Sequence, residues 1–349
     1  MKVFFKKIGL LMIPALLLGI VDVFVLPHTF WTYRFWEGIS YHKDLLTYGK
    51  FYQSQSLVMC ERGDLSDGVD SISYSLNEWI TDEYGFRNDE FIGKPDIVLL
   101  GDSFVVGTGL DQSELLSKQL SRLFGDRIKV YNMAPVPLRT LDIMVKKGLI
   151  EKPDILVYEF VEEMFPEPFV PYLSGKYDAI KVPISAWVNA SQINMIWDKL
   201  IRLHWVHYFQ HKILDEKLQY PNIGDMYFYK GEAYRPFDEN GRLQTLKSLK
   251  GYQEYCEQNG IELIVMPLPL KETVYFEDIQ RPDLPQYLEG IHAGLDSLGI
   301  HHIKVLEAML ERGGEYYQKQ DTHWNAEGVS LAAELLKNKI GLGPEGRLK

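Results

Sequence analysis

A serine after a short apolar run is the first residue in this chain that could do chemistry. Residues 97–100 are Ile-Val-Leu-Leu, and Gly101, Asp102 and Ser103 follow them. Such a run is typical of a buried strand, and the glycine after it favours a tight strand-to-helix turn. A serine on this turn has an exposed hydroxyl beside the main-chain N–H groups that begin the next helix. The pattern therefore predicts a serine nucleophile.

A base for this serine, and a group to orient the base, stand near the end of the chain. A serine hydroxyl is a weak nucleophile unless a base takes its proton and a third group orients that base. Asp321 and His323 precede an expected helix, and residues two apart in an extended loop point to the same side. Asp321 can then accept the Nδ1 proton of His323, and Nε2 can take the proton of Ser103. Gly-Asp-Ser also occurs by chance, and Asp-x-His can be a helix cap, but both motifs at matching ends of one α/β chain favour a catalytic triad.

Strands and helices alternate between these two motifs. The strands are expected at residues 97–100, 128–131, 155–160, 261–266 and 302–306. The helices are expected at residues 115–123, 138–150, 246–258, 284–298 and 326–338. Helical units of about 10–15 residues between short apolar strands predict an α/β fold, with a parallel sheet covered on both faces.

The chain divides into three parts. Residues 1–40 are expected to form a cytoplasmic tip, a signal-anchor helix and an interfacial aromatic belt, residues 41–90 a polar lead-in, and residues 91–349 the catalytic domain. The lead-in contains a patch rich in Gly, Asp and Ser, residues 63–73, which is typical of a loop. An insertion, residues 162–242, is rich in aromatic residues and proline. It follows the carboxyl end of a strand, where open α/β sheets bind ligands, so we expect it to cap the site. Its tryptophans are Trp187, Trp197 and Trp205.

The amino-terminal segment has the pattern of a membrane anchor. Lysines precede an apolar stretch, residues 8–26, which only Pro14 and Asp22 interrupt. At about 1.5 Å per residue, a helix of this length approaches the ~30 Å thickness of the hydrocarbon layer. A cleaved secretory signal is the rival interpretation, but its apolar region would be shorter, about 7–15 residues, and would end at a cleavage site of small residues. The lysines before the span and the aromatic residues after it predict a cytoplasmic N-terminus and a catalytic domain in the periplasm or outside the cell.

Composition narrows the possible partners. The chain has 349 residues, of which 46% are hydrophobic and 24% charged, as in ordinary globular proteins. Its net charge is -11, and a nucleic-acid partner is not expected, because neutralising phosphates needs a basic surface. Cys60 and Cys256 could pair in an oxidising compartment, but their spacing does not show it.

A metal or other cofactor is not expected either. His204, His207 and His211 fall on one face of an expected helix and could in principle bind a metal. Aromatic residues are interleaved with them, so we interpret the segment as an amphipathic helix instead. The glycines near residue 107 lack the spacing and the lysine of a phosphate-binding loop.

Several segments resemble a known family. Residues 84–87, 97–104 and 130–132 are similar to the first half of SGNH (GDSL-type) hydrolases. Residues 158–162, 267–275 and 321–324 more narrowly resemble the SGNH-like domains of proteins that O-acetylate alginate and other cell-envelope polysaccharides. The resemblance implies a three-layer, flavodoxin-like fold and acyl-ester chemistry.

The resemblance is incomplete, above all at the oxyanion hole. In the alginate proteins the Asp-x-His segment precedes the serine, whereas here it follows, and most SGNH hydrolases have Asp-x-x-His. The family's glycine after Asn132 is missing, residues 135–137 are Pro-Val-Pro, and its Gly-x-Asn-Asp motif is replaced at residues 159–162. Proline has no N–H to donate. Besides the N–H of Ser103, the candidate oxyanion or substrate groups are Asn132, Arg139, Glu159 and Lys271.

Three functions fit these residues. The first is transfer of an acyl group, expected to be acetyl, to a cell-envelope polysaccharide, with the acyl donor supplied by a membrane acyltransferase. The second is hydrolysis of acyl esters of glycan or lipid by the same triad. The third is an inactive SGNH-like domain that binds glycan as a scaffold; the missing oxyanion residues favour it, and the intact triad opposes it.

Overall fold

The structure of this chain is a computed structural model that describes residues 2–25, 39–40, 48–66, 69, 71–162, 164–172, 221–229 and 239–341. The chain separates into two compact units, which are described separately. The larger unit comprises residues 48–174 and 217–349, and the smaller one comprises residues 1–47 and 175–216. Residues 48–90, expected as a lead-in, thus belong to the same unit as the candidate site.

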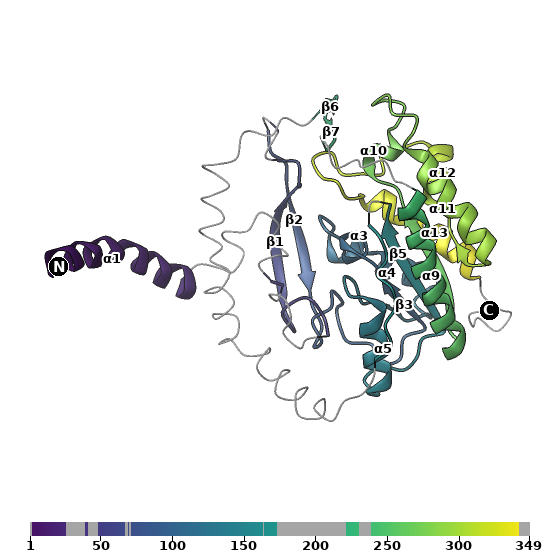
Figure 1. The fold of residues 1–349 in the computed structure, drawn as a ribbon, viewed down its shortest axis with the longest axis horizontal. Helices are drawn as coiled ribbons and strands as arrows, with labels where there is room; N and C mark the ends of the chain where they lie inside the picture. The colour runs from purple at the N-terminus through teal and green to yellow at the C-terminus, as the bar shows by residue number, and fades with distance from the viewer. Residues whose placement is uncertain are drawn as a thin grey trace. The chain divides into compact units, whose positions relative to one another are not determined.

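A five-stranded parallel sheet forms the centre of the larger unit (Figure 1). Its strands, in spatial order, are β4 (Val130–Asn132), β3 (Ile97–Leu100), β5 (Ile155–Val161), β8 (Glu262–Leu268) and β9 (His301–His302). The central strands β3, β5 and β8 are mostly apolar and buried, as expected where helices cover both faces. The α/β fold with a central parallel sheet that the sequence predicts is therefore confirmed.

Helices pack on both faces of this sheet. Those longer than one turn and a half are α4 (Leu116–Leu123), α5 (Leu138–Lys146), α9 (Glu239–Asn259), α11 (Pro285–Leu298), α12 (Val305–Arg312) and α13 (Ala326–Ile340). Side chains of α5, α9 and α11 share one hydrophobic core with Val98 and Leu100 of β3. Outside this core, α13 contacts both α4 and α12. The strand expected at residues 302–306 was wrong beyond His302, because Val305, Leu306 and Met309 are buried at helical spacing on α12.

The strand order places a crevice beside the serine. The chain enters the sheet at β3, adds β4 on one side and then β5 on the other. Connections that leave in opposite directions from neighbouring strands open a crevice at the carboxyl ends, where such sheets bind ligands. Ser103 is the first residue of α3 (Ser103–Val106), directly after β3, and thus lies at this point.

A hairpin outside the main sheet joins the region of Ser103. Strands β1 (Ser56–Arg62) and β2 (Tyr74–Ile80) pair antiparallel. Arg87, which is fully buried, connects the hairpin to the segment after α3 because it donates hydrogen bonds to the carbonyls of Glu78 (2.9 Å), Gly107 (2.6 Å) and Leu110 (2.7 Å). Its guanidinium also lies 3.6 Å from the ring centroid of Trp79. Strands β6 (Asn222–Ile223) and β7 (Met226–Tyr227) form a second, shorter hairpin.

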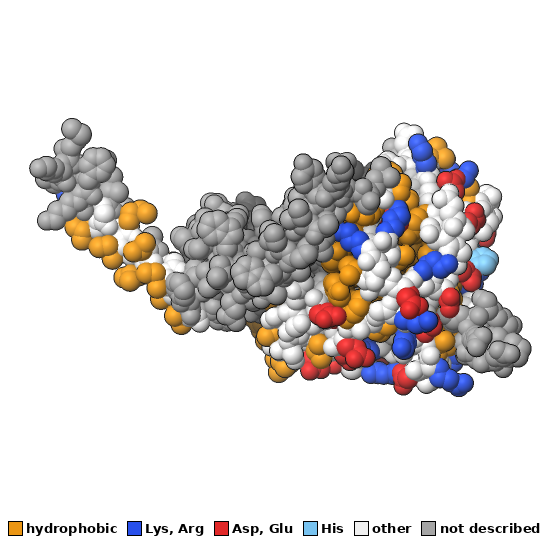
Figure 2. Space-filling view, turned by 90° about the horizontal axis from the view of Figure 1, so that it is seen from below, with side chains coloured by type: hydrophobic (Ala, Val, Ile, Leu, Met, Phe, Trp, Pro, Cys, Tyr) orange, Lys and Arg blue, Asp and Glu red, His pale blue; other side chains and the backbone are white. Residues whose placement is uncertain are grey.

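The described part of the smaller unit is chiefly helix α1 (Lys2–Phe24). Figure 2 shows apolar side chains along this helix. Leu10, Leu16 and Leu17 are among its exposed residues. Within the residues that the structure describes, no helix meets the length and apolarity needed to cross a membrane. The predicted anchor is therefore not confirmed and stays a prediction.

Candidate active site

The turn that carries Ser103 is built from its own neighbours. The carboxylate of Asp102 caps α3 by accepting the N–H of Phe104 at 2.8 Å, and the N–H of Gly107 reaches back to the carbonyl of Ser103 at 3.1 Å. Gly101 is required because a Cβ there would lie 2.3 Å from Oε2 of Glu159. As the first residue of α3, Ser103 has a main-chain N–H with no acceptor inside the helix, so it is available to a developing oxyanion.

The loop before α13 brings the base to this serine. Nε2 of His323 lies 2.7 Å from Oγ of Ser103, and Nδ1 lies 2.5 Å from Oδ1 of Asp321. The same Oδ1 accepts the main-chain N–H of His323 at 2.8 Å. Trp324 donates its indole N–H to the carbonyl of Phe104 at 3.1 Å, which ties the loop to α3. The three residues predicted as a triad are thus in hydrogen-bond contact in the order that proton transfer requires.

Charge around the imidazole favours its protonated form. Burial lowers the pKa of His323, but the nearby carboxylates of Asp321, Asp64 and Asp102 outweigh burial and raise the pKa above its ordinary value. Burial raises the pKa of Asp321, and the charge and hydrogen bonds of His323 more than offset this, so the pKa of Asp321 is lowered. The site can therefore hold an imidazolium beside an ionised carboxylate, as general base catalysis by histidine needs.

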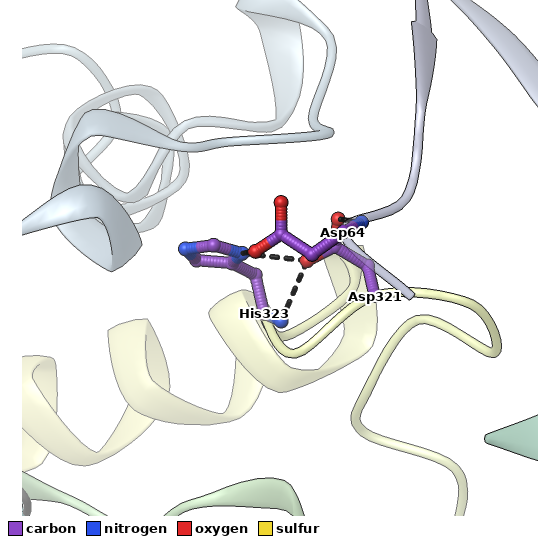
Figure 3. A group of neighbouring side chains, drawn as sticks. All are labelled: Asp64, Asp321 and His323. Carbon is purple, nitrogen blue, oxygen red and sulfur yellow. Dashed lines mark hydrogen bonds and ion pairs between the residues drawn. The ribbon is translucent and has the colours of Figure 1, made fainter. Parts of the chain in front are cut away.

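Asp64 is a residue of this site that the sequence prediction missed. It lies in the loop between β1 and β2, and its main-chain N–H donates to Oδ2 of Asp321 at 2.8 Å. Its own Oδ2 lies 3.8 Å from Nδ1 of His323 and accepts the hydroxyl of Thr322 at 3.1 Å. Figure 3 shows Asp64 entering from the hairpin and Asp321 from the loop before α13. The only sequence signal was the glycine before it: a Cβ at Gly63 would lie 1.9 Å from the carbonyl oxygen of Gln320.

Lys271, a candidate substrate group, lies behind the acid–base loop instead. Its ammonium donates to the carbonyls of Gln318 (2.6 Å), Lys319 (3.0 Å) and Asp321 (3.0 Å). These three bonds use its three N–H groups, so none is left for an oxyanion. Burial lowers the pKa of Lys271 to about 8, although Glu272 and Asp321 oppose the shift. Its role in the structure is to hold the loop.

Two other candidate oxyanion groups, Asn132 and Arg139, lie in different surroundings: the first is buried and the second is exposed. Asn132 is fully buried, and its side chain donates to the carbonyl of Val105 (2.9 Å) and accepts the N–H of Ala134 (2.9 Å). It therefore connects the end of β4 to α3 rather than standing as a free donor. Arg139 is exposed on the first turn of α5.

Glu159 forms a buried carboxyl pair with Asp102 beside the nucleophile turn. Its Oε2 accepts the N–H of Asp102 at 2.9 Å, and its side chain is almost completely buried. Burial and the charge of Asp102 raise the pKa of Glu159 well above its ordinary value. Burial also raises the pKa of Asp102, so the environment of the pair favours a protonated state of one of the two carboxyl groups.

A pocket adjoins this pair. Its volume is about 330 Å³, and it opens among the ends of β3 and β5, the loop after β4 and the first residues of the insertion. Its lining includes Gly101, Asp102, Pro135, Tyr158, Glu159, Phe165 and Tyr252. The walls are aromatic and apolar, and the lining also includes Glu159 and Asp102, the residue that precedes Ser103 in the chain.

Some predictions fall on residues outside the described ranges. They are the tryptophans of the expected cap, Trp187, Trp197 and Trp205, and the histidines His204, His207 and His211. Cys60, exposed on β1, and Cys256, buried on α9, are both free thiols.

A family model agrees with the geometry of the acid–base half. The model of the SGNH hydrolase-like domain of the acetyltransferase AlgX matches residues 226–346. Residues 226–346 are therefore similar to an SGNH hydrolase-like domain. The match includes Asp321 and His323, whereas Ser103 precedes it, so the assignment of Ser103 as the candidate nucleophile rests on its contact with His323. The resemblance to O-acetylation proteins that the sequence indicates is thus confirmed for this half.

Solved structures include similar proteins at low identity. The lipase/acylhydrolase from Enterococcus faecalis is 17% identical, with 74% of this chain and 98% of that chain covered and a TM-score of 0.34. A catalytic mutant of Axe2, an acetylxylan esterase from Geobacillus stearothermophilus, is 13% identical, with 72% and 97% covered and a TM-score of 0.36. At these identities and TM-scores the likeness carries no conclusion about the activity of the SGNH domain. No curated protein sequence matches the chain.

Proposed function

We propose that this protein transfers an acyl group, expected to be acetyl, to a cell-envelope polysaccharide through an acyl-enzyme on Ser103. The observation that carries the proposal is the continuous contact from Ser103 through His323 to Asp321, with distances of 2.7 and 2.5 Å. The match of the acid–base half to the AlgX domain supports acetyl transfer over other acyl chemistry.

Formation of the acyl-enzyme uses these contacts in order. Nε2 of His323 takes the proton of Ser103 as Oγ attacks the carbonyl carbon of the donor ester. Negative charge develops on the carbonyl oxygen, beside the N–H of Ser103. Collapse of the tetrahedral intermediate breaks the bond to the leaving alcohol, which receives the proton from His323. Asp321 stays ionised and holds the imidazole in the required tautomer.

The second half of the reaction repeats these steps with an acceptor. A sugar hydroxyl gives its proton to His323 and attacks the acyl-enzyme, and the serine is released when His323 returns the proton to Oγ. If water takes the place of the sugar hydroxyl, the outcome is ester hydrolysis by the same groups. Whether the protein acts as a transferase or an esterase therefore depends on whether a sugar hydroxyl or water attacks the acyl-enzyme.

The pocket lined by Asp102 and Glu159 supports a sugar as the acceptor. Tyr158, Phe165 and Tyr252 line it together with the carboxyls of Asp102 and Glu159. Apolar rings with a few polar groups are the usual lining of small-molecule sites, and such a mixture suits the two kinds of surface of a sugar ring. The expected cap, residues 162–242, would add further contacts to a polymeric substrate.

We further propose that the amino-terminal segment anchors the protein and keeps the SGNH domain in the periplasm or outside the cell. The supporting pattern is the apolar stretch at residues 8–26 after Lys2, Lys6 and Lys7. In this position the enzyme would meet envelope glycans and could receive acyl groups from a membrane acyltransferase.

One experiment separates the three functions. The purified full-length protein is given a chromogenic acetyl ester, with and without an acetyl-acceptor oligosaccharide, and released alcohol and acetylated sugar are both measured. Acetylated sugar that grows with acceptor concentration supports transfer, and release without acetylated sugar supports hydrolysis. If neither product forms and a fluorophosphonate does not label Ser103, the proposal is wrong and a glycan-binding scaffold takes its place. Ser297→Ala, which changes an exposed serine on α11, is the matched control for Ser103→Ala.

A further inference from the structure

Asp64 approaches the catalytic pair from a part of the chain with no motif. The segment that holds it is fixed to the acid–base loop by several bonds. The N–H of Leu65 donates to the carbonyl of Gln320 at 3.0 Å, the N–H of Ser73 donates to Oε1 of Gln320 at 2.9 Å, and Nε2 of Gln320 donates to the carbonyl of Ser71 at 2.8 Å. The hairpin loop and the acid–base loop are therefore held together at the position of Asp64.

Asp64 contacts the pair in two distinct ways. Its main-chain N–H binds the outer oxygen, Oδ2, of Asp321, which leaves Oδ1 to face His323. Its carboxylate stands 3.8 Å from Nδ1 of His323, and only 8% of the side chain is exposed. The first contact orients Asp321 for any side chain at position 64, whereas the second depends on the negative charge of aspartate.

We propose that Asp64 is a positioning residue, a second carboxylate that holds the His323–Asp321 pair and stabilises the imidazolium formed when Ser103 gives up its proton. This inference rests on the proposed function of Ser103 as nucleophile. Asp64 does not touch the substrate, and it acts through His323. It supplies from the hairpin a charge that the short Asp-x-His motif does not contain.

The electrostatics follow from the groups that face the imidazole. Three carboxylates lie around it: Asp321 from its own loop, Asp64 from the hairpin loop and Asp102 from the turn before α3. The side chains of His323 and Asp321 are each only 4% exposed, so water screens these charges weakly. A negative charge at this distance favours the charged form of histidine, which is the form present as the tetrahedral intermediate is made.

The side chains of Asp64, Asp321 and His323 could be taken for a metal site, since their ligand atoms lie within 4.8 Å of one another. The contacts of His323 oppose this interpretation. Nδ1 is bonded to Asp321 and Nε2 to Ser103, so neither nitrogen offers a free lone pair and an unused direction to a cation. The cluster is therefore better explained as part of the proton-transfer chain.

Asp64→Asn is the decisive variant, because asparagine keeps the shape, the main-chain N–H and an acceptor for Thr322 while it removes the charge. We expect kcat/KM to fall about 10- to 100-fold, as for other groups that orient a catalytic residue from behind, with KM nearly unchanged. The acid limb of the pH profile should move to lower pH, because a histidine with fewer negative neighbours loses its proton more easily. Asp283→Asn, which changes an exposed aspartate before α11, should leave both rate and profile unchanged.

A measurement that needs no activity completes the test. The titration of His323 is followed by NMR in a Ser103→Ala background, with His323→Gln to assign the signal, and then with Asp64→Asn added. A lower pKa of His323 in the double variant supports the inference even if no substrate is found. An unchanged titration, in a protein whose Ser103→Ala variant is inactive, overturns the role of Asp64 and leaves the proposed function standing. If Asp64→Asn does not fold, Asp64→Ser removes the same charge with a smaller side chain and must give the same shift.

Discussion

The two halves of the candidate active site are held in place in different ways. The nucleophile turn follows β3 and contains several bonds of its own: Asp102 caps α3, and the N–H groups of Val106 and Gly107 bond to carbonyls within residues 102–107. The acid–base loop is held from far away. Its partners Asp64, Ser73 and Lys271 stand 257, 247 and 50 positions from the loop residues that they bind.

The two halves should therefore be sensitive to substitutions in different parts of the chain. A change in the loop between β1 and β2 should leave Ser103 in place, because the turn is held by its own hydrogen bonds and by Glu159 and Asn132 at the ends of neighbouring strands. The acid–base loop should respond to changes in the hairpin and in α10 (Lys271–Val274), because these elements supply its bonds. Variants of the two halves can therefore be compared directly.

The largest effect is expected at the nucleophile itself. Ser103→Ala should lower kcat by about 10⁶-fold, as removal of the serine does in enzymes with this triad, and should hardly change stability because one hydroxyl is lost. Turnover of an acetyl ester and the thermal midpoint are the two measurements. Retained activity would show that another group is the nucleophile.

Asp321→Asn should be the next largest. The amide cannot hold His323 in the tautomer that accepts the serine proton, and in a serine protease triad this change costs about 10⁴-fold in kcat. Fluorophosphonate labelling of Ser103 should slow in parallel, since it needs the same base. A loss of less than tenfold would mean that Asp64 takes over the role of orienting His323. Asp64 and Asp321 would then be interchangeable in that role.

The comparison also explains which part of the site the sequence could predict. Ser103, Asp321 and His323 were found because each motif is short and its consequences are local: a strand end, a turn, and two residues on one side of a loop. The central strands and helices followed from periodicity for the same reason. The hairpin β1–β2 was missed because its strands expose apolar residues such as Val58 and Leu76, which breaks the expected alternation.

Long-range partners could not be predicted from spacing. Lys271 was a candidate substrate group, yet it binds the carbonyls of the acid–base loop, since its burial needs acceptors that only the fold brings near. Asp64 had no motif at all. Both residues acquire their roles through contacts between distant segments, and a single sequence carries no direct signal of those.

Lys271→Met tests the support of the acid–base loop. Methionine keeps the apolar stem but leaves one buried and two part-buried carbonyls without this donor, so we expect the free energy of unfolding to fall by roughly 3 kcal/mol. Lys304→Met, at an exposed position on the surface, should change it by no more than about 0.5 kcal/mol. Chemical denaturation of both variants measures the difference, and equal losses would contradict a specific role for Lys271.

Gly63→Ala tests the contact between the hairpin and the loop. A Cβ at residue 63 would lie 1.9 Å from the carbonyl oxygen of Gln320 and 3.0 Å from the nitrogen of Asp321, so the main chain of one segment must move. We expect about a tenfold loss of kcat/KM, since Asp321 would shift relative to His323. Gly251→Ala is the control, because nothing lies within 4 Å of a Cβ there and alanine favours helix α9 by about 1 kcal/mol. Normal activity in Gly63→Ala would show that the loop keeps its place without the hairpin.

The smallest effect is expected at Glu159, in the local half of the site. If Glu159 carries a proton, Glu159→Gln replaces a neutral group by another of similar shape, and activity near pH 7 should stay within a few-fold.

The pH dependence of stability tests whether Glu159 is protonated in the folded protein. The pKa of Glu159 is raised in the folded protein, so above pH 4.5 the folded state binds a proton that the unfolded state has lost. The free energy of unfolding then falls as pH rises, and Glu159→Gln removes this fall. Denaturation is measured at pH 5 and pH 8. The free energy of unfolding of Glu159→Gln, relative to that of the natural protein, should be higher at pH 8 than at pH 5. Glu289→Gln, at an exposed position, is the control and should show no such difference. If the relative free energy of unfolding of Glu159→Gln is instead lower at pH 8, Glu159 is ionised in the folded protein. A positively charged group would then have to compensate the charges of Glu159 and Asp102.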